Sequence, residues 1–353
     1  MKIDRVHFYT KNAVSTKDWL INNVGFRAIG NCIEQDTHTE LVALNSALFA
    51  ISSPLNSDSP VAKYLASHPS GVVDLAFRVQ NLAAIVDRAR RLGLKLIRGI
   101  GDLSPRHNLK SAVIAGWGSL RHTLIEGTAP YSCCLPNFNS YQYCNEQPKS
   151  NISHIDHVVL NVSQGKLASA VELYQSLFEM EIQQSFEIAT DKSGLSSQAL
   201  IDREGEVQFN INEPTSLNSQ IQEFIDLNNG SGIQHLALRS HDLIADVTKM
   251  QQGRLEFLQV PPAYYSKLNS LPLTMAEKQA IATQQILVDR DRHISQSLLM
   301  QIFTRPIFEL PTFFLEFIER RHNAQGFGGG NFKALFEAVE REQDSRQGDR
   351  SLA

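Results

Sequence analysis

The 353-residue sequence contains little cysteine. Its four cysteines are Cys32, Cys133, Cys134 and Cys144. So few cysteines exclude a small secreted fold built on disulfides, and the adjacent pair Cys133-Cys134 has poor spacing for a zinc site. The cysteine usage therefore predicts a reduced, cytoplasmic protein.

The sequence also lacks an excess of one charge and long apolar runs. The net charge of −4 and the pI of about 6.3 provide no basic surface, which argues against nucleic acid or anionic lipid as a partner. No segment approaches the roughly 18 apolar residues that a membrane span requires, and no apolar signal core precedes the first strand-like segment. The chain has 42% hydrophobic and 20% charged residues, a composition typical of a globular protein with room for two domains.

What the chain does contain is an internal duplication. Residues 3–8 (IDRVHF) return as 155–160 (IDHVVL), residues 71–78 (GVVDLAFR) as 232–239 (GIQHLALR), and residues 120–126 (LRHTLIE) as 313–319 (FFLEFIE). Repeats in the same order over this distance predict two homologous halves.

The periodicity within each half favours an α+β fold. Each half begins with alternating apolar and polar residues, typical of a strand, followed by a helical pattern over residues 15–23 or 166–178. Short strands are then expected at 39–44 and 47–52, and at 197–201 and 207–211. This count fits two βαβββ modules per half. We expect a first domain over 1–126, a linker over 127–153 with three prolines, a second domain over 154–343, and a polar tail over 344–353.

The second half is longer than the first. Asp74 and Thr123 are 49 residues apart, whereas their counterparts His235 and Glu316 are 81 residues apart. The surplus of 32 lies around residues 253–285, with a polar helix expected near 274–285, and is either a substrate-handling element or a surface helix. The segment 289–297 is expected to lie outside any site.

Three matched positions distinguish the two halves chemically. The second half carries two imidazoles and one carboxylate, at His157, His235 and Glu316. One histidine among 11 proves little, since each could be an ordinary core or surface residue. However, all three fall at corresponding strand parity, and the first half has Arg5, Asp74 and Thr123 there. His154 falls on the opposite strand face and is not expected to be a ligand. The pattern predicts a metal site in the second half alone.

The ligand types indicate which metal binds. Two neutral imidazoles and one carboxylate occupy one face of an octahedron and leave three positions open, as in non-haem Fe(II) oxygenases. Zinc more often has four ligands and a single open position. Three open positions suit O₂ together with a substrate that binds through two oxygens. Such a substrate is either an α-keto acid or a diol, and the triad alone does not decide between them.

Further segments of the second half resemble one enzyme family. Over roughly residues 150–343 the chain is similar to the 4-hydroxyphenylpyruvate dioxygenases of the vicinal oxygen chelate superfamily, and the first half is similar more loosely. The resemblance is carried by the segments SGLSSQAL (193–200), NEP (212–214), GIQHLAL (232–238), PPAYY (261–265), LMQIFT (299–304), FLE (314–316) and GFGGGNFKALFE (326–337).

The resemblance implies roles for these positions. The triad would hold one Fe(II) per chain inside an open barrel, and the reaction would convert 4-hydroxyphenylpyruvate and O₂ to homogentisate and CO₂ by decarboxylation, ring hydroxylation and side-chain migration. The oligomeric state stays open, a homo-oligomer included. The polar residues of the active site would be Gln220, Gln234, Gln301, Ser197 and Asn212. The ring-binding wall and gate would be Phe303, Phe314, Phe327, Asn331 and Phe332.

Two of these expectations can be examined physically. Gln234 precedes His235 and faces the other side of an ideal strand, so an inward role requires a local twist or bulge. The glycines of residues 326–330 precede a helical stripe of Phe332, Leu335, Phe336 and Val339. A flexible segment followed by an amphipathic helix could form a gate over a cavity, or the helix could simply pack on the sheet.

Three other functions remain open on the sequence. Hydroxymandelate synthase uses the same substrate and metal but hydroxylates the benzylic carbon. An extradiol dioxygenase of the same superfamily would take a catechol, which the Gly-rich gate and the glutamines argue against. A non-catalytic binding protein of the same fold is disfavoured by the intact triad.

Overall fold

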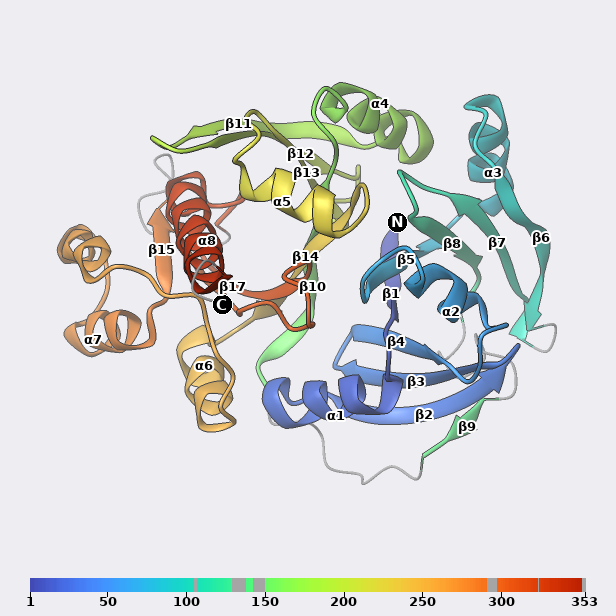
Figure 1. The fold of residues 1–353 in the computed structure, drawn as a ribbon, viewed down its shortest axis with the longest axis horizontal. Helices are drawn as coiled ribbons and strands as arrows, with labels where there is room; N and C mark the ends of the chain where they lie inside the picture. Colours follow the sequence, from blue (N-terminus) through green and yellow to red (C-terminus); the bar gives the residue numbers. More distant parts are fainter. Residues whose placement is uncertain (105–106, 129–137, 142–149, 291–296, 323, 351–353) are drawn as a thin grey trace.

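The computed structural model describes residues 1–104, 107–128, 138–141, 150–290, 297–322 and 324–350, and it contains two curled sheets, one from each half (Figure 1). In chain order the first half contains β1 (Lys2–Tyr9), α1 (Ala13–Val24), β2 (Arg27–Glu34), β3 (Thr37–Leu44), β4 (Ala47–Pro54), α2 (Pro60–Leu65), β5 (Gly71–Val79), α3 (Leu82–Arg91), β6 (Leu96–Ser104), β7 (Leu109–Ala115) and β8 (Arg121–Glu126), followed by the short β9 (Asn139–Ser140).

The second half repeats this order with additions near its end. It contains β10 (Ile152–Asn161), α4 (Leu167–Phe178), β11 (Glu181–Ala189), β12 (Gly194–Ile201), β13 (Gln208–Pro214), α5 (Gln220–Leu227), β14 (Gly232–Ser240), α6 (Leu243–Gln252), the 3-10 helix η3 (Pro262–Ser270), α7 (Met275–Gln284), β15 (Leu287–Arg290), β16 (Leu298–Phe303), β17 (Phe314–Arg321) and α8 (Gly329–Arg350). The strands and helices expected from periodicity are thus present.

The sheet topology confirms the duplicated α+β fold. The first sheet has the order β6-β7-β8-β5-β1-β4-β3-β2-β9, and the second has the order β11-β12-β13-β10-β14-β17-β16-β15. Within every module the strands run second, third, fourth, first, and the first strand is parallel to the fourth. The two modules of a half join through one antiparallel pair, β1 with β5 or β10 with β14.

Strand register confirms that the metal-site positions of the two halves correspond. Arg5 lies opposite Ala76, as His157 lies opposite Ala237. The register of β14 with β17 then places Glu316 opposite Ala237. The sequence alignment of the halves is therefore also a structural alignment.

Two register shifts affect residues beside the expected ligands. Asp156 has no opposite residue, because Ile155 pairs with Leu238 and His157 already pairs with Ala237. Gln234 is likewise unpaired, lying between the residues that face Val159 and Leu160. A β-bulge redirects side chains locally, so the bulge that an inward Gln234 requires is present.

Apolar and aromatic side chains join the two halves. Phe77 of β5 lies 5.1 Å from Phe178 of α4 and 6.3 Å from Phe209 of β13, measured between ring centroids. Phe8 of β1 lies 5.2 Å from Phe313, just before β17. Such aromatic pairs each contribute about 0.5–1.5 kcal/mol beyond area burial, so the first half supports the second through a shared core.

The α8 helix packs beside α5, β11 and β15 (Figure 1). The expected apolar stripe is present: Leu335 and Phe336 are buried, and Phe332 and Val339 are partly buried. The helix continues through residues 344–350, where the sequence predicted a polar tail. The polar helix expected in the insertion is α7, which begins with a capping box of Thr274 and Glu277.

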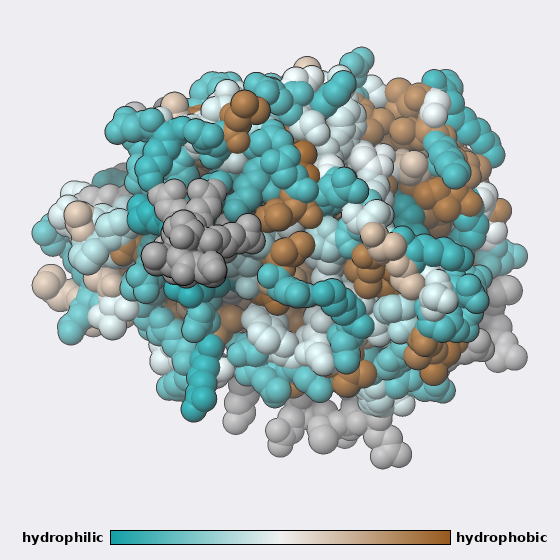
Figure 2. Space-filling model, in the orientation of Figure 1, coloured by the Kyte–Doolittle hydropathy of each residue, from teal (hydrophilic) through white to brown (hydrophobic). Residues whose placement is uncertain are grey.

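The expected linker is described only in part, since residues 129–137 and 142–149, which include Cys133, Cys134 and Cys144, lie outside the described residues. Between them β9 pairs with β2, and Cys32 is a buried free thiol. Among the described helices, none has both the length and the apolar character that crossing a membrane requires. Hydrophilic residues cover most of the face shown in Figure 2, and hydrophobic residues there form small groups.

Candidate metal centre

The three expected ligands meet at the centre of the second sheet. His157 on β10, His235 on β14 and Glu316 on β17 come from three adjacent strands, and all are buried. Glu316 Oε2 lies 3.2 Å from His157 Nε2 and 3.4 Å from His235 Nε2. Within the described residues they form the one group of three or more His, Cys, Asp or Glu side chains close enough to bind a single ion.

The spacing of these atoms fits a divalent metal ion. Donor atoms bound in perpendicular directions to one ion at about 2.1 Å lie about 3 Å apart. The distances from Glu316 to both imidazoles are close to this value. The residues present can therefore hold a metal, and the donor set is the two-histidine, one-carboxylate type.

Charge at the site favours a cation. Burial alone lowers the pKa of His157, but the Glu316 and Asp156 carboxylates outweigh burial and raise this pKa to about 9. Burial opposes ionisation of Glu316, yet the His157 charge and hydrogen bonds from both imidazoles lower its pKa to about 2. Burial lowers the pKa of His235. Without metal, the site near neutral pH therefore holds one proton on His157 beside an ionised Glu316.

Metal binding near neutral pH should release about one proton per ion. The ion requires a neutral imidazole, so it displaces the proton from His157, whereas Glu316 and His235 have none to lose. The apparent affinity should consequently rise with pH up to about 9. Anaerobic calorimetric titration with Fe(II) in two buffers of different ionisation enthalpy measures the proton count. A count near zero would contradict this protonation state.

Behind His157, Asp156 and Arg320 hold the imidazole in place. Asp156 Oδ1 lies 3.0 Å from His157 Nδ1, which leaves Nε2 facing Glu316. Arg320 donates to both carboxylate oxygens of Asp156, at 2.9 and 2.6 Å, and Arg239 donates at 3.1 Å. Burial opposes ionisation of Asp156, but chiefly the Arg320 charge keeps its pKa well below the usual range. A carboxylate on the second nitrogen fixes the tautomer of a metal-binding histidine.

Gln301 connects the expected ligand Glu316 to residues 326–343, the segment expected to form a gate. Its Nε2 donates to Glu316 Oε1 at 2.9 Å, and its Oε1 accepts from Asn331 Nδ2 at 2.9 Å. The Tyr264 hydroxyl donates to Asn331 Oδ1 at 2.6 Å. Tyr264 lies in η3, within the insertion, and Asn331 lies in the first turn of α8. The insertion therefore contacts the gate instead of forming an isolated surface helix.

Aromatic rings flank both imidazoles. Phe314 stacks on His235 with centroids 4.6 Å apart, and Phe303 meets His235 edge-on at 6.3 Å. Phe327 lies 5.1 Å from His157 in an edge arrangement. Phe332 stacks on Phe186 of β11 at 5.3 Å, beside the site. Three of the four expected phenylalanines thus contact the imidazoles, and the fourth lies at the base of α8.

A polar row crosses the sheet on the ligand side. Ser197, Asn212 and Asn161 lie opposite one another on β12, β13 and β10. Asn210 lies opposite Val159, which is itself opposite His235, so register places all four side chains on the face of His235. Among the described residues, no hydrogen-bond partner exists for Ser197 Oγ, Asn212 Oδ1, Asn161 Nδ2 and Asn210 Oδ1.

These unpaired atoms indicate a bound molecule. Buried polar atoms almost always have a partner, and leaving one without costs about 1–3 kcal/mol. Four in one row are best explained by a polar ligand or ordered water at that place. The sequence analysis missed Asn161 and Asn210. The available signal was strand parity, because Asn161 is four residues after His157 and Asn210 is two residues before Asn212.

The remaining two glutamines, Gln220 and Gln234, lie side by side. Gln234 Nε2 donates to Gln220 Oε1 at 2.8 Å, and both side chains are buried. Gln220 is the first residue of α5, capped by Ser219, whereas Gln234 is the bulged residue of β14. No hydrogen bond recorded among the described residues joins this pair to the triad.

The matching positions of the first half form hydrogen bonds and an ion pair within that half. Thr123 donates to Asp74 through Oγ1 at 2.6 Å and through its backbone N–H at 3.0 Å. Arg5 turns to Asp4, with Nη1 2.8 Å from its carboxylate. No metal-binding group of three His, Cys, Asp or Glu residues is found among the described residues of this half.

The protein should therefore bind one divalent ion per chain. Elemental analysis after anaerobic Fe(II) loading and removal of free metal measures the ratio. A ratio near two would show that the first half also binds metal, which its internal hydrogen bonds argue against.

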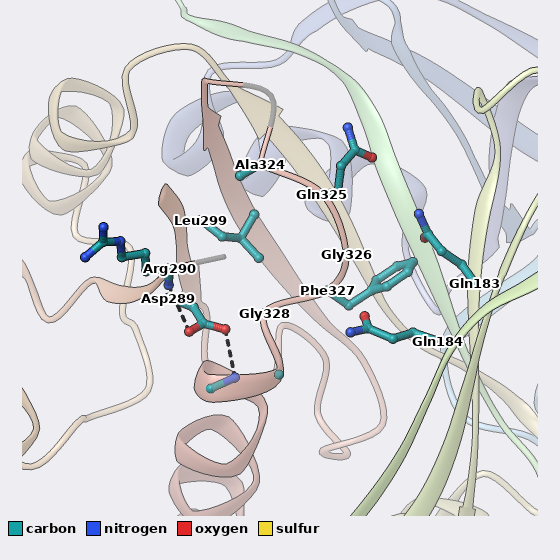
Figure 3. Close-up of a pocket in the computed structure, with 12 residues that line it drawn as sticks. Gln183, Gln184, Asp289, Arg290, Leu299, Ala324, Gln325, Gly326, Phe327 and Gly328 are labelled. Carbon is teal, nitrogen blue, oxygen red and sulfur yellow. Dashed lines mark hydrogen bonds between the residues drawn. The ribbon is translucent and has the colours of Figure 1, made fainter. Parts of the chain in front are cut away.

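A cavity of about 490 Å³ lies beside the segment that leads into α8 (Figure 3). Residues 324–330 form one wall, and β11 and β15 contribute others. Gly328 has φ +72°, and a Cβ there would lie 2.3 Å from Gln301 Oε1, so only glycine fits. Asp289 of β15 accepts from the Gly330 N–H at 2.8 Å. Of the segment 289–297, which was expected to lie outside the site, Asp289 thus contacts the first turn of α8, and residues 291–296 lie outside the described residues.

The chain is similar to known proteins over its whole length. Residues 154–270 match the family model of the Glyoxalase/Bleomycin resistance protein/Dioxygenase superfamily. The chain is 34% identical to the 4-hydroxyphenylpyruvate dioxygenase of Yarrowia lipolytica, over 97% of this chain and 92% of that one. It is 32% identical to the enzyme of Dictyostelium discoideum, over 97% and 98%. The chain belongs to the 4-hydroxyphenylpyruvate dioxygenase family.

A solved structure supports the same assignment. A triple variant of 4-hydroxymandelate synthase from Streptomyces coelicolor superposes with a TM-score of 0.87 at 27% identity, covering 97% of this chain and 98% of that one. Family membership confirms the resemblance carried by residues 150–343 and extends it over the first half. The protein is accordingly a dioxygenase of the vicinal oxygen chelate type.

Proposed function

We propose that the protein is an Fe(II)-dependent dioxygenase that converts 4-hydroxyphenylpyruvate and O₂ to homogentisate and CO₂. The observation that carries the proposal is the buried triad of His157, His235 and Glu316 in a chain similar over its whole length to 4-hydroxyphenylpyruvate dioxygenases. The equation balances: C₉H₈O₄ and O₂ give C₈H₈O₄ and CO₂.

The metal and the protein would have different roles in this reaction. Bound Fe(II) would supply activation of O₂ coupled to oxidative loss of the substrate carboxyl group. His157, His235 and Glu316 would hold it, and Gln301 would keep Glu316 oriented through its 2.9 Å hydrogen bond. The phenylalanines around the imidazoles provide an apolar wall for an aromatic ring.

The polar row would orient the phenol. Ser197, Asn212, Asn161 and Asn210 are uncharged and offer both donors and acceptors. Their unpaired atoms suit a neutral hydroxyl better than a carboxylate, because none of the four carries a positive charge. We propose that the phenol end of the substrate lies toward this row and the keto-acid end toward the triad.

The gate would exclude water. Phe327 is only 2% exposed and covers the His157 side of the triad, while Asn331 secures the first turn of α8 to Gln301. A closed site protects a reactive oxidant from side reactions and strengthens local electrostatics. The scarcity of cysteine supports a cytoplasmic location for this reaction.

Product identification tests the proposal. The full-length protein is loaded with Fe(II) without O₂, mixed with 4-hydroxyphenylpyruvate and then exposed to O₂. Homogentisate and 4-hydroxymandelate are isomers, so the product must be separated by chromatography against both standards. We expect homogentisate with one CO₂ released per O₂ consumed. Absence of any iron-dependent product would overturn the proposal.

The same experiment decides the second candidate. The structural similarity to 4-hydroxymandelate synthase favours benzylic hydroxylation as the alternative outcome. A product that elutes with 4-hydroxymandelate would assign that reaction. Turnover of a catechol in place of the keto acid would instead indicate an extradiol dioxygenase.

A further inference from the structure

Arg320 connects the metal site to the start of the gate. It lies on β17, four residues after Glu316, and its side chain is 6% exposed. Two of its nitrogens, Nε and Nη2, donate to Asp156, the carboxylate behind His157. The third, Nη1, donates to the carbonyl oxygens of Ala324 and Gly326. One guanidinium thus joins the support of a ligand to the backbone that precedes Phe327.

The gate backbone is bent where Arg320 binds it. Gly326 has φ +77° and Gly328 has φ +72°, so both neighbours of Phe327 lie in the left-handed region. The intervening Phe327 meets the His157 imidazole edge-on, with ring centroids 5.1 Å apart. The start of the gate therefore contacts His157 twice, directly through Phe327 and indirectly through Arg320 and Asp156.

The duplicated half provides an internal comparison. Asp4 and Arg78 match Asp156 and Arg239, and the ion pair between them is kept. The position that matches Arg320 is Gly127. In the first half the triad positions hold Arg5, Asp74 and Thr123, and no counterpart of α8 is found among its described residues. This half thus retains the ion pair but has glycine in place of Arg320. Both halves share the fold, but the arginine at this position is present only in the half that has the triad and α8.

We propose that Arg320 is a positioning residue that couples closure of the gate to the orientation of His157. The inference rests on the metal site and gate of the proposed function. A guanidinium is planar and presents its donors in a fixed fork, so it satisfies Asp156 and the gate carbonyls together only when the gate is closed. Opening the gate leaves Nη1 of Arg320 buried without an acceptor. If the guanidinium then moves toward water, it pulls away from Asp156 and disturbs the orientation of the imidazole.

Coupling of this kind must act in both directions. An ion bound to His157 fixes the imidazole, hence Asp156 and Arg320, and thereby orders residues 324–328. Binding of Fe(II) should slow hydrogen exchange of backbone amides in that segment and in the first turn of α8. A coupling of roughly 5- to 150-fold is typical between linked sites, so a protection of that order is expected in the wild-type protein.

The experiment is hydrogen exchange followed by mass spectrometry on the full-length protein, with and without saturating Fe(II) under anaerobic conditions. The test variant is Arg320→Lys, which keeps the charge but loses the fork. The matched control is Arg239→Lys, because Arg239 also binds Asp156 yet does not contact the gate carbonyls. Elemental analysis confirms that every Fe(II)-loaded sample carries iron, and a cooperative melt confirms folding.

The expected result is protection of the gate by Fe(II) in wild type and in Arg239→Lys, with protection lost in Arg320→Lys. Should Arg320→Lys fail to fold, Asp156→Asn breaks the same connection at its metal end and should also lose protection. Equal protection in Arg320→Lys and wild type would overturn the coupling. So would a wild-type gate whose exchange does not change when Fe(II) binds, or a wild-type protein that binds no Fe(II).

The test is independent of turnover. The exchange measurement uses no substrate, so the coupling can hold even if the product is not homogentisate. Conversely, normal homogentisate formation with an unresponsive gate would leave the proposed function intact and remove only the role of Arg320.

Discussion

Replacing Glu316 with alanine should reduce homogentisate formation by on the order of 10³-fold or more. The change removes the only charged ligand, and with it several kcal/mol of stabilisation that a bound metal gives to developing charge. It also removes the acceptor of the Gln301 hydrogen bond. Product formation by chromatography and iron content by elemental analysis measure the two consequences in the same sample.

The matched control for this variant is Glu319→Gln. Glu319 is a buried carboxylate on the same strand, but it accepts from the Leu243 N–H at the start of α6 and not from the triad. The amide oxygen that Glu319→Gln introduces can still accept from the Leu243 N–H, but the ion pair of Glu319 with Arg321 is lost. This should cost about 1 kcal/mol of stability or less, while iron content should stay at the wild-type level. Full iron content and full activity in Glu316→Ala would refute the ligand assignment.

Removing everything from Gly326 onward should lower coupled homogentisate formation by roughly 10²-fold while the protein still binds iron at saturating Fe(II). All three ligands lie upstream of the cut, but Phe327 and Asn331, which contact His157 and Gln301, are lost. A small misplacement of reacting groups can lower a rate by about 10²-fold. Without the gate, water also reaches the oxidant. Homogentisate formed per O₂ consumed measures the uncoupling.

Two further variants make the gate experiment decisive. Truncation after residue 343 removes only the polar end of the chain and should leave activity unchanged. Phe327→Ala keeps α8 and its buried Leu335 and Phe336, and should uncouple O₂ use without unfolding. The long truncation counts only if it still melts cooperatively. A folded protein without the gate that makes homogentisate at the normal rate and coupling would show that α8 serves for packing alone.

The ligands could be predicted from the sequence because the chain is duplicated. Each strand position in the second half can be compared with the matching position in the first half. His157, His235 and Glu316 differ from their counterparts at the same register positions, and the register of β10, β14 and β17 confirms this correspondence. The bulge at Gln234 was predictable because the family resemblance implied an inward role for this residue, which a regular strand does not allow. The fold class followed from the repeat of βαβββ modules.

What the sequence did not predict are contacts between residues distant along the chain. Asp156 and Arg320 are 164 residues apart, and nothing in local periodicity joins them. Asn161 and Asn210 look like ordinary strand residues until sheet register places Asn161 opposite Asn212 and Asn210 opposite Val159. The hydrogen bond from the Gly330 N–H to Asp289 likewise depends on the position of α8, which local pattern does not determine.

The insertion was open between two interpretations, and the structure favours one of them. Tyr264 reaches the gate through Asn331, and its hydroxyl also accepts from the Val288 N–H at 2.9 Å. Through Tyr264, η3 therefore contacts the first turn of α8, and α7 packs against η3. The surplus residues of the second half, like Arg320, have no counterpart in the half that lacks the triad.

The most direct test of this account is the location of iron in crystals of the full-length protein loaded with Fe(II) without O₂. Anomalous diffraction measured on both sides of the iron absorption edge locates each bound ion independently of activity. The account predicts a single peak enclosed by His157 Nε2, His235 Nε2 and Glu316 Oε2, with none beside Asp74 and Thr123. A peak elsewhere, or a second peak in the first half, would contradict it.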